Sequence, residues 1–223
     1  MTARQAFDLS VYLVLGHGDC RHHGLEEVVA AALHGGATLV QLREKDLPVQ
    51  DYLELARSLL PLLDRAGVPL VVNDRVEEAV ALGATDGKVG LHVGQNDLPA
   101  AEVRARVGPR PFLGLSVRRP EEAMAAPLEA VDHLGVGPVY TTTTKANAAA
   151  PIGPAGVAAV RAVTSLPLVG IGGITAEQAP EVIAAGAQGV AVVSAIAGSD
   201  DPQSATAQLA QAVTEGDALR NRS

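Results

Sequence analysis

The sequence predicts an α/β fold, a single-domain (β/α)8 TIM barrel, on three observations. Eight short apolar runs rich in β-branched residues recur along the chain of 223 residues. Segments with the helical spacing of Ala, Leu and Glu lie between these runs, as expected for parallel strands joined by right-handed crossovers. One strand and one helix together take about 28 residues, so eight such units fill one barrel. We therefore expect one domain over residues 1–223, with a frayed tail at 215–223.

The expected strands coincide with the apolar runs. They are predicted at 11–15, 38–42, 68–73, 89–93, 112–116, 133–137, 166–171 and 189–194. The clearest helices are predicted at 24–36, 51–67 and 175–187, and several end in Gly, as helix C-termini often do. We expect loops at 85–90, where "TDGKVG" is a local elaboration, and at 138–153, which has no period. Loops as long as the second one are usually functional or mobile.

The composition is that of an ordinary globular enzyme. Apolar residues make up 48% of the chain and charged residues 19%, far from the signature of disorder. A net charge of -8 argues against a surface that holds nucleic acid or anionic lipid. No apolar run approaches the ~18 residues of a membrane span, and a single cysteine, Cys20, excludes an intramolecular disulfide framework. Because the start lacks an apolar h-region, we expect a cytoplasmic protein. The sequence leaves open whether it is a monomer or a homo-oligomer.

Polar residues alternate with others at the end of the second expected strand, in "VQLREKD" (40–46). Alternate side chains of a barrel strand point into the lumen, so Gln41, Arg43 and Lys45 are expected to face inward. The residues between them are expected to face the helix layer. Buried unpaired charges cost several kcal/mol each. The two cations therefore need either a carboxylate, which would make a structural ion pair, or a polyanionic ligand.

Carboxylates follow the next two expected strands. Asn73 and Asp74 end the third strand, and Asp97 follows the fourth. Each of them could simply cap the helix that comes next. Two carboxylates at adjacent strand ends can instead share Mg2+, which is held by one or two carboxylates and by phosphate oxygens of a substrate. The cations and the metal would then hold one pyrophosphate.

A second anion site is predicted at the last two strands. "GIGGIT" places Gly172 and Gly173 between a strand and a helix, and "VVSAIAGS" ends a strand with Ser194. Loops at these positions of a barrel frequently bind phosphate through backbone N–H groups. The alternative is a tight turn with a capping serine. "TTTTK" (141–145) adds hydroxyl groups and the cation of Lys145, whereas the six histidines show no convincing metal-ligand spacing.

Taken together, the motifs resemble those of the thiamine-phosphate synthase family. "LVQLREKD", "VVNDRVEEAVALGA", "LHVGQNDLP", "GLSV", "GVGPVYTTTTK", "GIGGIT" and "GVAVVSAI" occur in the expected order over roughly residues 11–197. The resemblance implies a barrel enzyme that joins 4-amino-2-methyl-5-(diphosphooxymethyl)pyrimidine to a thiazole phosphate, carboxylated or not. The products are thiamine phosphate and pyrophosphate. The carbon–oxygen bond ionises first, and the thiazole nitrogen then attacks the pyrimidine methyl cation.

The resemblance also implies a role for each matching residue. The pyrimidine pyrophosphate would contact Gln41, Leu42, Arg43, Glu44, Lys45, Asn73, Ser116 and Lys145. Of these, Arg43, Lys45 and Lys145 would be catalytic. The thiazole phosphate would contact Thr142, Thr143, Thr144, Gly172, Gly173, Val193 and Ser194. Asp74 and Asp97 would hold one Mg2+ per subunit.

Some positions depart from the family pattern, and two other functions compete. The first strand ends in "LVLGHGDC" instead of a "VTD"-like turn, Ala146 stands where a second lysine is common, and Thr141 where a proline is common. A thiazole tautomerase-like relative would not need the pyrophosphate set, and it uses a histidine where this chain has Arg118. The other competitor is a non-catalytic sensor that binds thiamine precursors.

Overall fold

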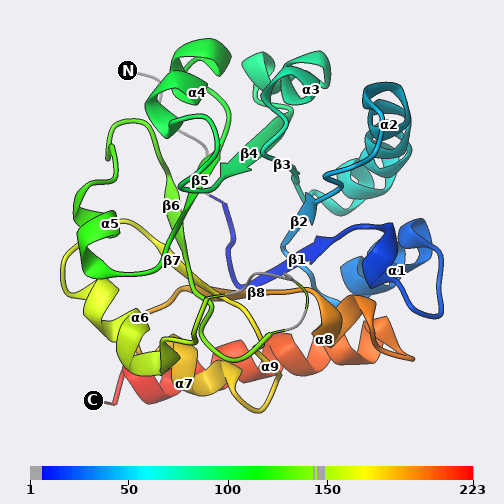
Figure 1. Cartoon of the computed structure of the whole chain (residues 1–223). Helices are drawn as coiled ribbons and strands as arrows, with labels where there is room; N and C mark the ends of the chain where they lie inside the picture. The colour runs from blue at the N-terminus through cyan, green and yellow to red at the C-terminus, as the bar shows by residue number, and fades with distance from the viewer. Residues whose placement is uncertain (1–6, 143, 145–148, 223) are drawn as a thin grey trace.

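The computed structural model of the chain describes residues 7–142, 144 and 149–222, and these form a closed parallel barrel (Figure 1). The strands pair in chain order from β1 to β8, and β8 closes the barrel by pairing with β1. The predicted single-domain (β/α)8 barrel is therefore confirmed. Among the described helices, none combines the length and the apolar character needed to cross a membrane.

The eight strands lie where the apolar runs predicted them. They are β1 (Val11–Leu15), β2 (Leu39–Leu42), β3 (Leu70–Asn73), β4 (Val89–Val93), β5 (Leu113–Val117), β6 (His133–Val136), β7 (Leu168–Ile171) and β8 (Gly189–Val192). The expected bounds of β1 and β4 agree with the structure, and the other strands differ by one or two residues at an end. These differences arise because an apolar run can continue into a turn after the ladder hydrogen bonds have ended.

Helices surround the barrel (Figure 1). They are η1 (His17–Asp19), α1 (Leu25–Gly35), α2 (Val49–Ala66), α3 (Val76–Ala81), η2 (Ala84–Asp86), α4 (Ala100–Val107), α5 (Pro120–Met124), α6 (Gly153–Arg161), α7 (Ala179–Ala184), α8 (Ser194–Ala197) and α9 (Pro202–Arg220). The predicted glycine ends of α1 and α2 are confirmed. Gly36 and Gly67 have φ angles of 99° and 67°, a left-handed conformation that glycine adopts without steric cost.

Two expectations about the loops and the tail need correction. The segment 85–90 is not one loop, because η2 extends to Asp86 and β4 already begins at Val89. The segment 215–220, expected to fray, instead continues α9 as far as Arg220. The guanidinium of Arg220 donates to the Ala187 carbonyl at 2.8 Å, and α9 packs against α7 and α1. The contacts of α9 with its neighbours hold this end of the chain, whereas its polar sequence suggested that it is free.

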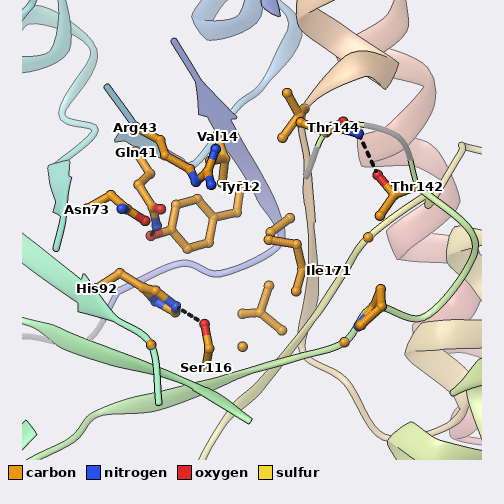
Figure 2. A pocket seen from close by; sticks show the side chains of 18 of the residues that line it. Tyr12, Val14, Gln41, Arg43, Asn73, His92, Ser116, Thr142, Thr144 and Ile171 are labelled. Carbon is orange, nitrogen blue, oxygen red and sulfur yellow. Dashed lines mark hydrogen bonds between the residues drawn. The ribbon is translucent and has the colours of Figure 1, made fainter. Parts of the chain in front are cut away.

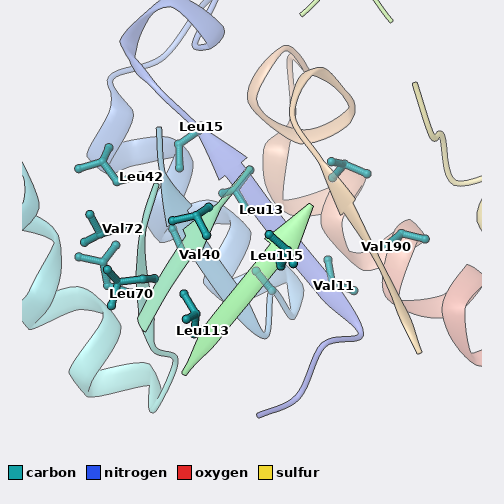
Figure 3. Packing of buried hydrophobic residues seen from close by; sticks show 14 of the residues in the cluster. Val11, Leu13, Leu15, Val40, Leu42, Leu70, Val72, Leu113, Leu115 and Val190 are labelled. Atoms are coloured by element: carbon teal, nitrogen blue, oxygen red, sulfur yellow. The ribbon is translucent and has the colours of Figure 1, made fainter. Parts of the chain in front are cut away.

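Both faces of the strands are buried, and alternate residues pack into two different apolar cores. Val40 and Leu42 of β2 belong to the large core between the strands and the helices (Figure 3). Leu39 belongs to a smaller cluster with Tyr12 and Val71, from the opposite faces of their strands. The inner face of β2 therefore continues from Leu39 to Gln41, which is also buried. This alternation directs polar side chains at the strand ends toward the barrel interior.

Candidate functional site

A pocket of about 380 Å3 opens at the carboxyl ends of the strands (Figure 2). In barrel enzymes this is the face where active sites are found. Its lining brings together thirteen residues that the sequence predicted: Gln41, Arg43, Lys45, Asn73, Asp74, Asp97, Ser116, Thr142, Thr144, Gly172, Gly173, Val193 and Ser194. Two more predicted residues, Thr143 and Lys145, lie outside the described part of the chain.

Leu42 and Glu44 do not line the pocket, although the resemblance implied that they contact a substrate. The side chain of Leu42 is fully buried in the outer core. The Glu44 carboxylate accepts hydrogen bonds from the backbone N–H of His17 and from its Nδ1, the latter at 2.8 Å. Both side chains point away from the pocket because strand alternation continues past the end of β2. The predicted substrate contacts of these two residues stay untested.

The two cations of the "VQLREKD" stretch both reach the pocket, but from a loop. β2 ends at Leu42, so Arg43 and Lys45 follow the strand and line the pocket from the segment that leads to α2. Lys45 Nζ lies 3.2 Å from Asp74 Oδ2, and the Lys45 side chain is 50% exposed. This matches the structural ion pair considered above, although an exposed pair contributes little stability. Arg43 makes no ion pair with the described residues, so its charge stays available for a ligand.

Asp74 is held in a conformation that is rare for a residue with a side chain. Its φ angle is 60°, and strain of this kind is found at functional sites more often than elsewhere. The amide of Asn73 donates to Asp74 Oδ2 at 2.6 Å. Burial and the neighbouring carboxyl of Asp97 raise the pKa of Asp74, and Lys45 opposes this shift. The two carboxyl groups therefore face each other closely enough to repel when both are ionised.

The capping alternative for these carboxylates is not observed. α3 and α4 begin without a side-chain capping hydrogen bond, with Arg75 and Pro99 at their N-caps. Asp97 instead accepts a hydrogen bond from the backbone N–H of Gly94 at 2.9 Å, within its own loop. A pair of hard oxygen ligands that repel each other suits Mg2+, since the cation removes the repulsion. No cluster of three or more ligand residues occurs among the described residues, so substrate oxygens would have to complete the coordination.

The floor of the pocket is polar but uncharged. Gln41 Nε2 donates to the Tyr12 hydroxyl at 2.6 Å, and burial raises the pKa of Tyr12 far above neutral pH. His92 Nε2 lies 2.9 Å from Ser116 Oγ (Figure 2), and burial lowers the pKa of His92 to about 4. Burial, and then His92, also lower the pKa of His133. All three rings are therefore neutral near pH 7.

The sequence interpretation assigned no role to Tyr12, His92 or His133, yet all three line the pocket. A signal was present for two of them. Tyr12 and His92 stand at alternate positions of their strands, and His92 pairs with Asn73 in the β3–β4 register. Side chains alternate along each strand, and neighbouring strands pair in register. If Gln41 and Asn73 face the barrel interior, these two rules predict that the rings of Tyr12 and His92 face it too.

Thr142 and Thr144 lie across the pocket from Gln41 and Asn73 (Figure 2), on the side formed by the ends of β6 to β8. Gly172 and Gly173 after β7 have φ angles of 100° and 66°. A Cβ atom on Gly173 would lie 2.3 Å from the Thr141 carbonyl oxygen. Turn geometry and close packing are therefore enough to explain why both positions are glycine. This is the tight turn that the alternative interpretation predicted. Ser194 does not make a capping hydrogen bond at the start of α8.

These features define a (β/α)8 barrel with a polar, charged pocket at the face where barrel enzymes have their active sites, and comparisons with known proteins give its family. The family model described as "Thiamine monophosphate synthase" matches residues 11–196. The "Thiamine-phosphate synthase" of Xanthobacter autotrophicus is 53% identical over 93% of this chain and 96% of its own length. That of Roseiflexus sp. is 45% identical over 89% of this chain and 83% of its own length.

A solved structure supports the same conclusion. The "Thiamine phosphate pyrophosphorylase from Pyrococcus furiosus" aligns with a TM-score of 0.83 and 32% identity, covering 94% of this chain and 97% of that one. The chain therefore belongs to the thiamine monophosphate synthase family. Its activity is that of a thiamine-phosphate synthase, a transferase that releases pyrophosphate.

Proposed function

We propose that the pocket holds its two substrates against opposite walls. The pyrimidine pyrophosphate would lie against Gln41, Arg43, Lys45, Asn73 and Ser116, with Lys145 as a further cation. The thiazole phosphate would lie against Thr142, Thr143, Thr144, Gly172, Gly173, Val193 and Ser194. The observation that carries the proposal is the arrangement of the lining: two cations and two carboxylates from adjacent strands face a neutral wall of hydroxyl groups and glycines.

The neutral floor supports a dissociative reaction. When the carbon–oxygen bond ionises, negative charge develops on the leaving pyrophosphate and positive charge on the pyrimidine methyl group. Arg43 can bind two phosphate oxygens at once, whereas Lys45 acts as a point charge. Because the pKa of His92 is lowered to about 4 and that of Tyr12 is raised, the imidazole is a weak base and the phenol stays protonated, so neither is a strong base or nucleophile. Stabilisation of charge and correct positioning are then the main contributions of the chain to the rate.

Asp74 and Asp97 fit the Mg2+ that this family typically uses. When bound, one Mg2+ per subunit would neutralise charge on the departing pyrophosphate. The amide of Asn73 orients Asp74 by a hydrogen bond, and the Gly94 N–H orients Asp97 in the same way. The raised pKa of Asp74 supports this assignment, because a nearby cation would favour the ionised form of both carboxyl groups.

A direct assay tests the proposed function. Purified protein is mixed with Mg2+, the pyrimidine pyrophosphate and the thiazole phosphate, in separate series with the plain and the carboxylated thiazole. Release of pyrophosphate together with thiamine phosphate is the expected result. Binding of both substrates without either product would favour the sensor function instead. The cytoplasmic location and a homo-oligomeric state stay predictions.

A further inference from the structure

We propose that Arg75 is a positioning residue for the reaction: it fastens the loop that carries Lys45 to the end of β3 that carries Asp74. The proposal rests on the proposed function, in which Lys45 binds pyrophosphate and Asp74 binds Mg2+. Arg75 does not line the pocket. It would act only by holding residues that do.

The guanidinium of Arg75 contacts the neighbouring loop and the two helices beside it. Nε donates to the Glu44 carbonyl at 2.8 Å, and Nη2 donates to the Lys45 carbonyl at 3.0 Å and to the Leu47 carbonyl. Nη1 pairs with the Glu78 carboxylate at 2.9 Å. The guanidinium carbon also lies 4.6 Å from the centre of the Tyr52 ring, in a cation–π contact.

The loop needs such a partner because it has no secondary structure of its own. Residues 43–48 lie between β2 and α2, and no backbone N–H of the described residues donates to the carbonyls of Glu44, Lys45 or Leu47. Backbone carbonyls that are partly removed from water require a donor. These three carbonyls share one guanidinium, whose side chain is only 14% exposed. Arg75 is therefore a main support of the loop, beside the contact of Glu44 with His17.

The backbone at Asp74 and Arg75, from which the guanidinium extends, is also held by hydrogen bonds. Arg75 directly follows Asp74, whose φ angle is 60°. The Asp74 N–H donates to the His92 carbonyl at 2.9 Å, and the Arg75 N–H donates to the Asn73 carbonyl at 2.7 Å. The guanidinium is thus anchored to a rigid strand end. Because Lys45 Nζ lies 3.2 Å from Asp74 Oδ2, a shift of the loop would change the spacing between the cation and the carboxylate.

The chain offers a matched control in Arg104. Its guanidinium donates to the carbonyls of Ala130, Gly108 and Pro111 at 2.8, 2.9 and 2.8 Å, and to the Asp132 carboxylate at 2.8 Å. Its side chain is 13% exposed, close to the value for Arg75. It contacts the segments that lead into β5 and β6, at the amino ends of the strands and away from the pocket. Arg75 and Arg104 therefore make similar hydrogen bonds, but Arg75 contacts the loop beside the pocket and Arg104 contacts segments away from it.

The experiment compares Arg75→Lys with Arg104→Lys in the whole protein. Lysine keeps the charge but cannot bond three carbonyls in a fixed plane. We expect both variants to lose a similar amount of thermal stability. Only Arg75→Lys should lower kcat/KM for the pyrimidine pyrophosphate, by about tenfold to a hundredfold, and raise the Mg2+ concentration for half-maximal rate. Its KM for the thiazole phosphate should stay within about twofold of wild type, because the opposite wall is untouched.

Hydrogen exchange supplies a second readout that a general loss of stability would not mimic. Amides of residues 43–47 should exchange faster in Arg75→Lys and at the wild-type rate in Arg104→Lys. If Arg75→Lys does not fold, Glu78→Gln takes its place, since it removes the carboxylate partner of the guanidinium but keeps the three carbonyl contacts. A smaller change of the same kind is then expected. Equal kinetic effects from both arginine variants, or unchanged exchange at 43–47, would overturn the proposal.

Two further variants separate this proposal from the proposed function. Lys45→Met and Asp74→Asn should each lose most of the activity. If they do so while Arg75→Lys keeps wild-type kinetics, the positioning role alone is wrong. If Lys45→Met and Asp74→Asn keep wild-type activity, the assignment of the pocket walls is wrong, and the role of Arg75 fails with it.

Discussion

The two walls of the pocket are built on different principles. The wall at the ends of β2 to β4 consists of charged side chains, Arg43, Lys45, Asp74 and Asp97. The wall at the ends of β6 to β8 consists largely of hydroxyl groups and backbone, with Gly172 and Gly173 in left-handed conformations. The first wall can stabilise a charge that appears during the reaction. The second provides shape, so the two should respond differently to substitution.

Arg43→Ala gives the strongest test of the charged wall. We expect kcat/KM for the pyrimidine pyrophosphate to fall by about a hundredfold to a thousandfold, because a preorganised donor to the leaving group is lost. Thermal stability should change little, since Arg43 makes no ion pair with the described residues. Arg106→Ala, which removes an exposed ion pair with Glu77, is the control for loss of a positive charge. If Arg43→Ala kept normal activity, the proposal that the charged wall stabilises the leaving pyrophosphate would be wrong.

Gly173→Ala tests the backbone wall, with Gly67→Ala as its control. The φ angles are 66° and 67°, so both substitutions carry the left-handed cost of about 1 to 2 kcal/mol. Only at Gly173 does the new Cβ also meet a carbonyl oxygen, at 2.3 Å, whereas nothing lies within 4 Å at Gly67. We expect a total loss of about 3 kcal/mol for Gly173→Ala and a higher KM for the thiazole phosphate. Denaturant unfolding of both variants checks this, and equal losses would contradict it.

Removal of Mg2+ should weaken binding at one wall only. We expect the Kd of the pyrimidine pyrophosphate to rise by about thirtyfold in EDTA, or about 2 kcal/mol, while the Kd of the thiazole phosphate stays unchanged. The Asp74→Asn variant should bind the pyrimidine pyrophosphate with this weaker affinity both in Mg2+ and in EDTA. Calorimetry measures each of these Kd values. Equal affinity of the wild type in EDTA would argue against a metal site at Asp74 and Asp97.

The smallest expected effect concerns the floor between the walls. Burial and His92 hold the pKa of His133 well below its ordinary value. The unfolded imidazole binds a proton near pH 6.5 and the folded one does not, so stability is complete above about pH 6.5 and declines as the pH falls. Between pH 7.5 and 5.5 we expect His133→Gln to lose about 1 kcal/mol less than wild type. Urea unfolding at the two pH values measures this difference, and an identical pH dependence would show that His133 is not responsible.

Parts of the site were predictable because they follow from strand geometry. Alternation predicted that Gln41, Arg43 and Lys45 share one side, and the order of strands in a barrel predicted that Asp74 and Asp97 come near each other. The family resemblance also implied substrate contacts for Leu42 and Glu44, and these stay predictions, although neither side chain lines the pocket. The alternation that directs Arg43 inward directs these two side chains outward. Lys145 and Thr143 keep their predicted roles untested, since they lie outside the described residues.

Other parts depended on the paths of loops. Whether Asp97 caps a helix or faces Asp74 is decided by a hydrogen bond from Gly94 in the same loop. That Arg75 reaches three carbonyls about thirty positions earlier in the chain follows from how two connecting segments lie beside each other. Neither feature leaves a periodic trace: the first depends on how one loop turns back on itself, and the second on a long side chain that reaches a distant segment.

By itself, the sequence determined the barrel, the facing of the residues in "VQLREKD" and the chemical character of the pocket. Periodicity is a local property, set by allowed backbone angles and by the alternation of side chains, so it can be read without coordinates. Only the tertiary structure decided that Asp97 does not cap a helix, which cation forms no ion pair with the described residues and which arginine holds the loop. Those outcomes depend on distances between segments far apart in the chain, and burial then decides how strongly each charge is felt.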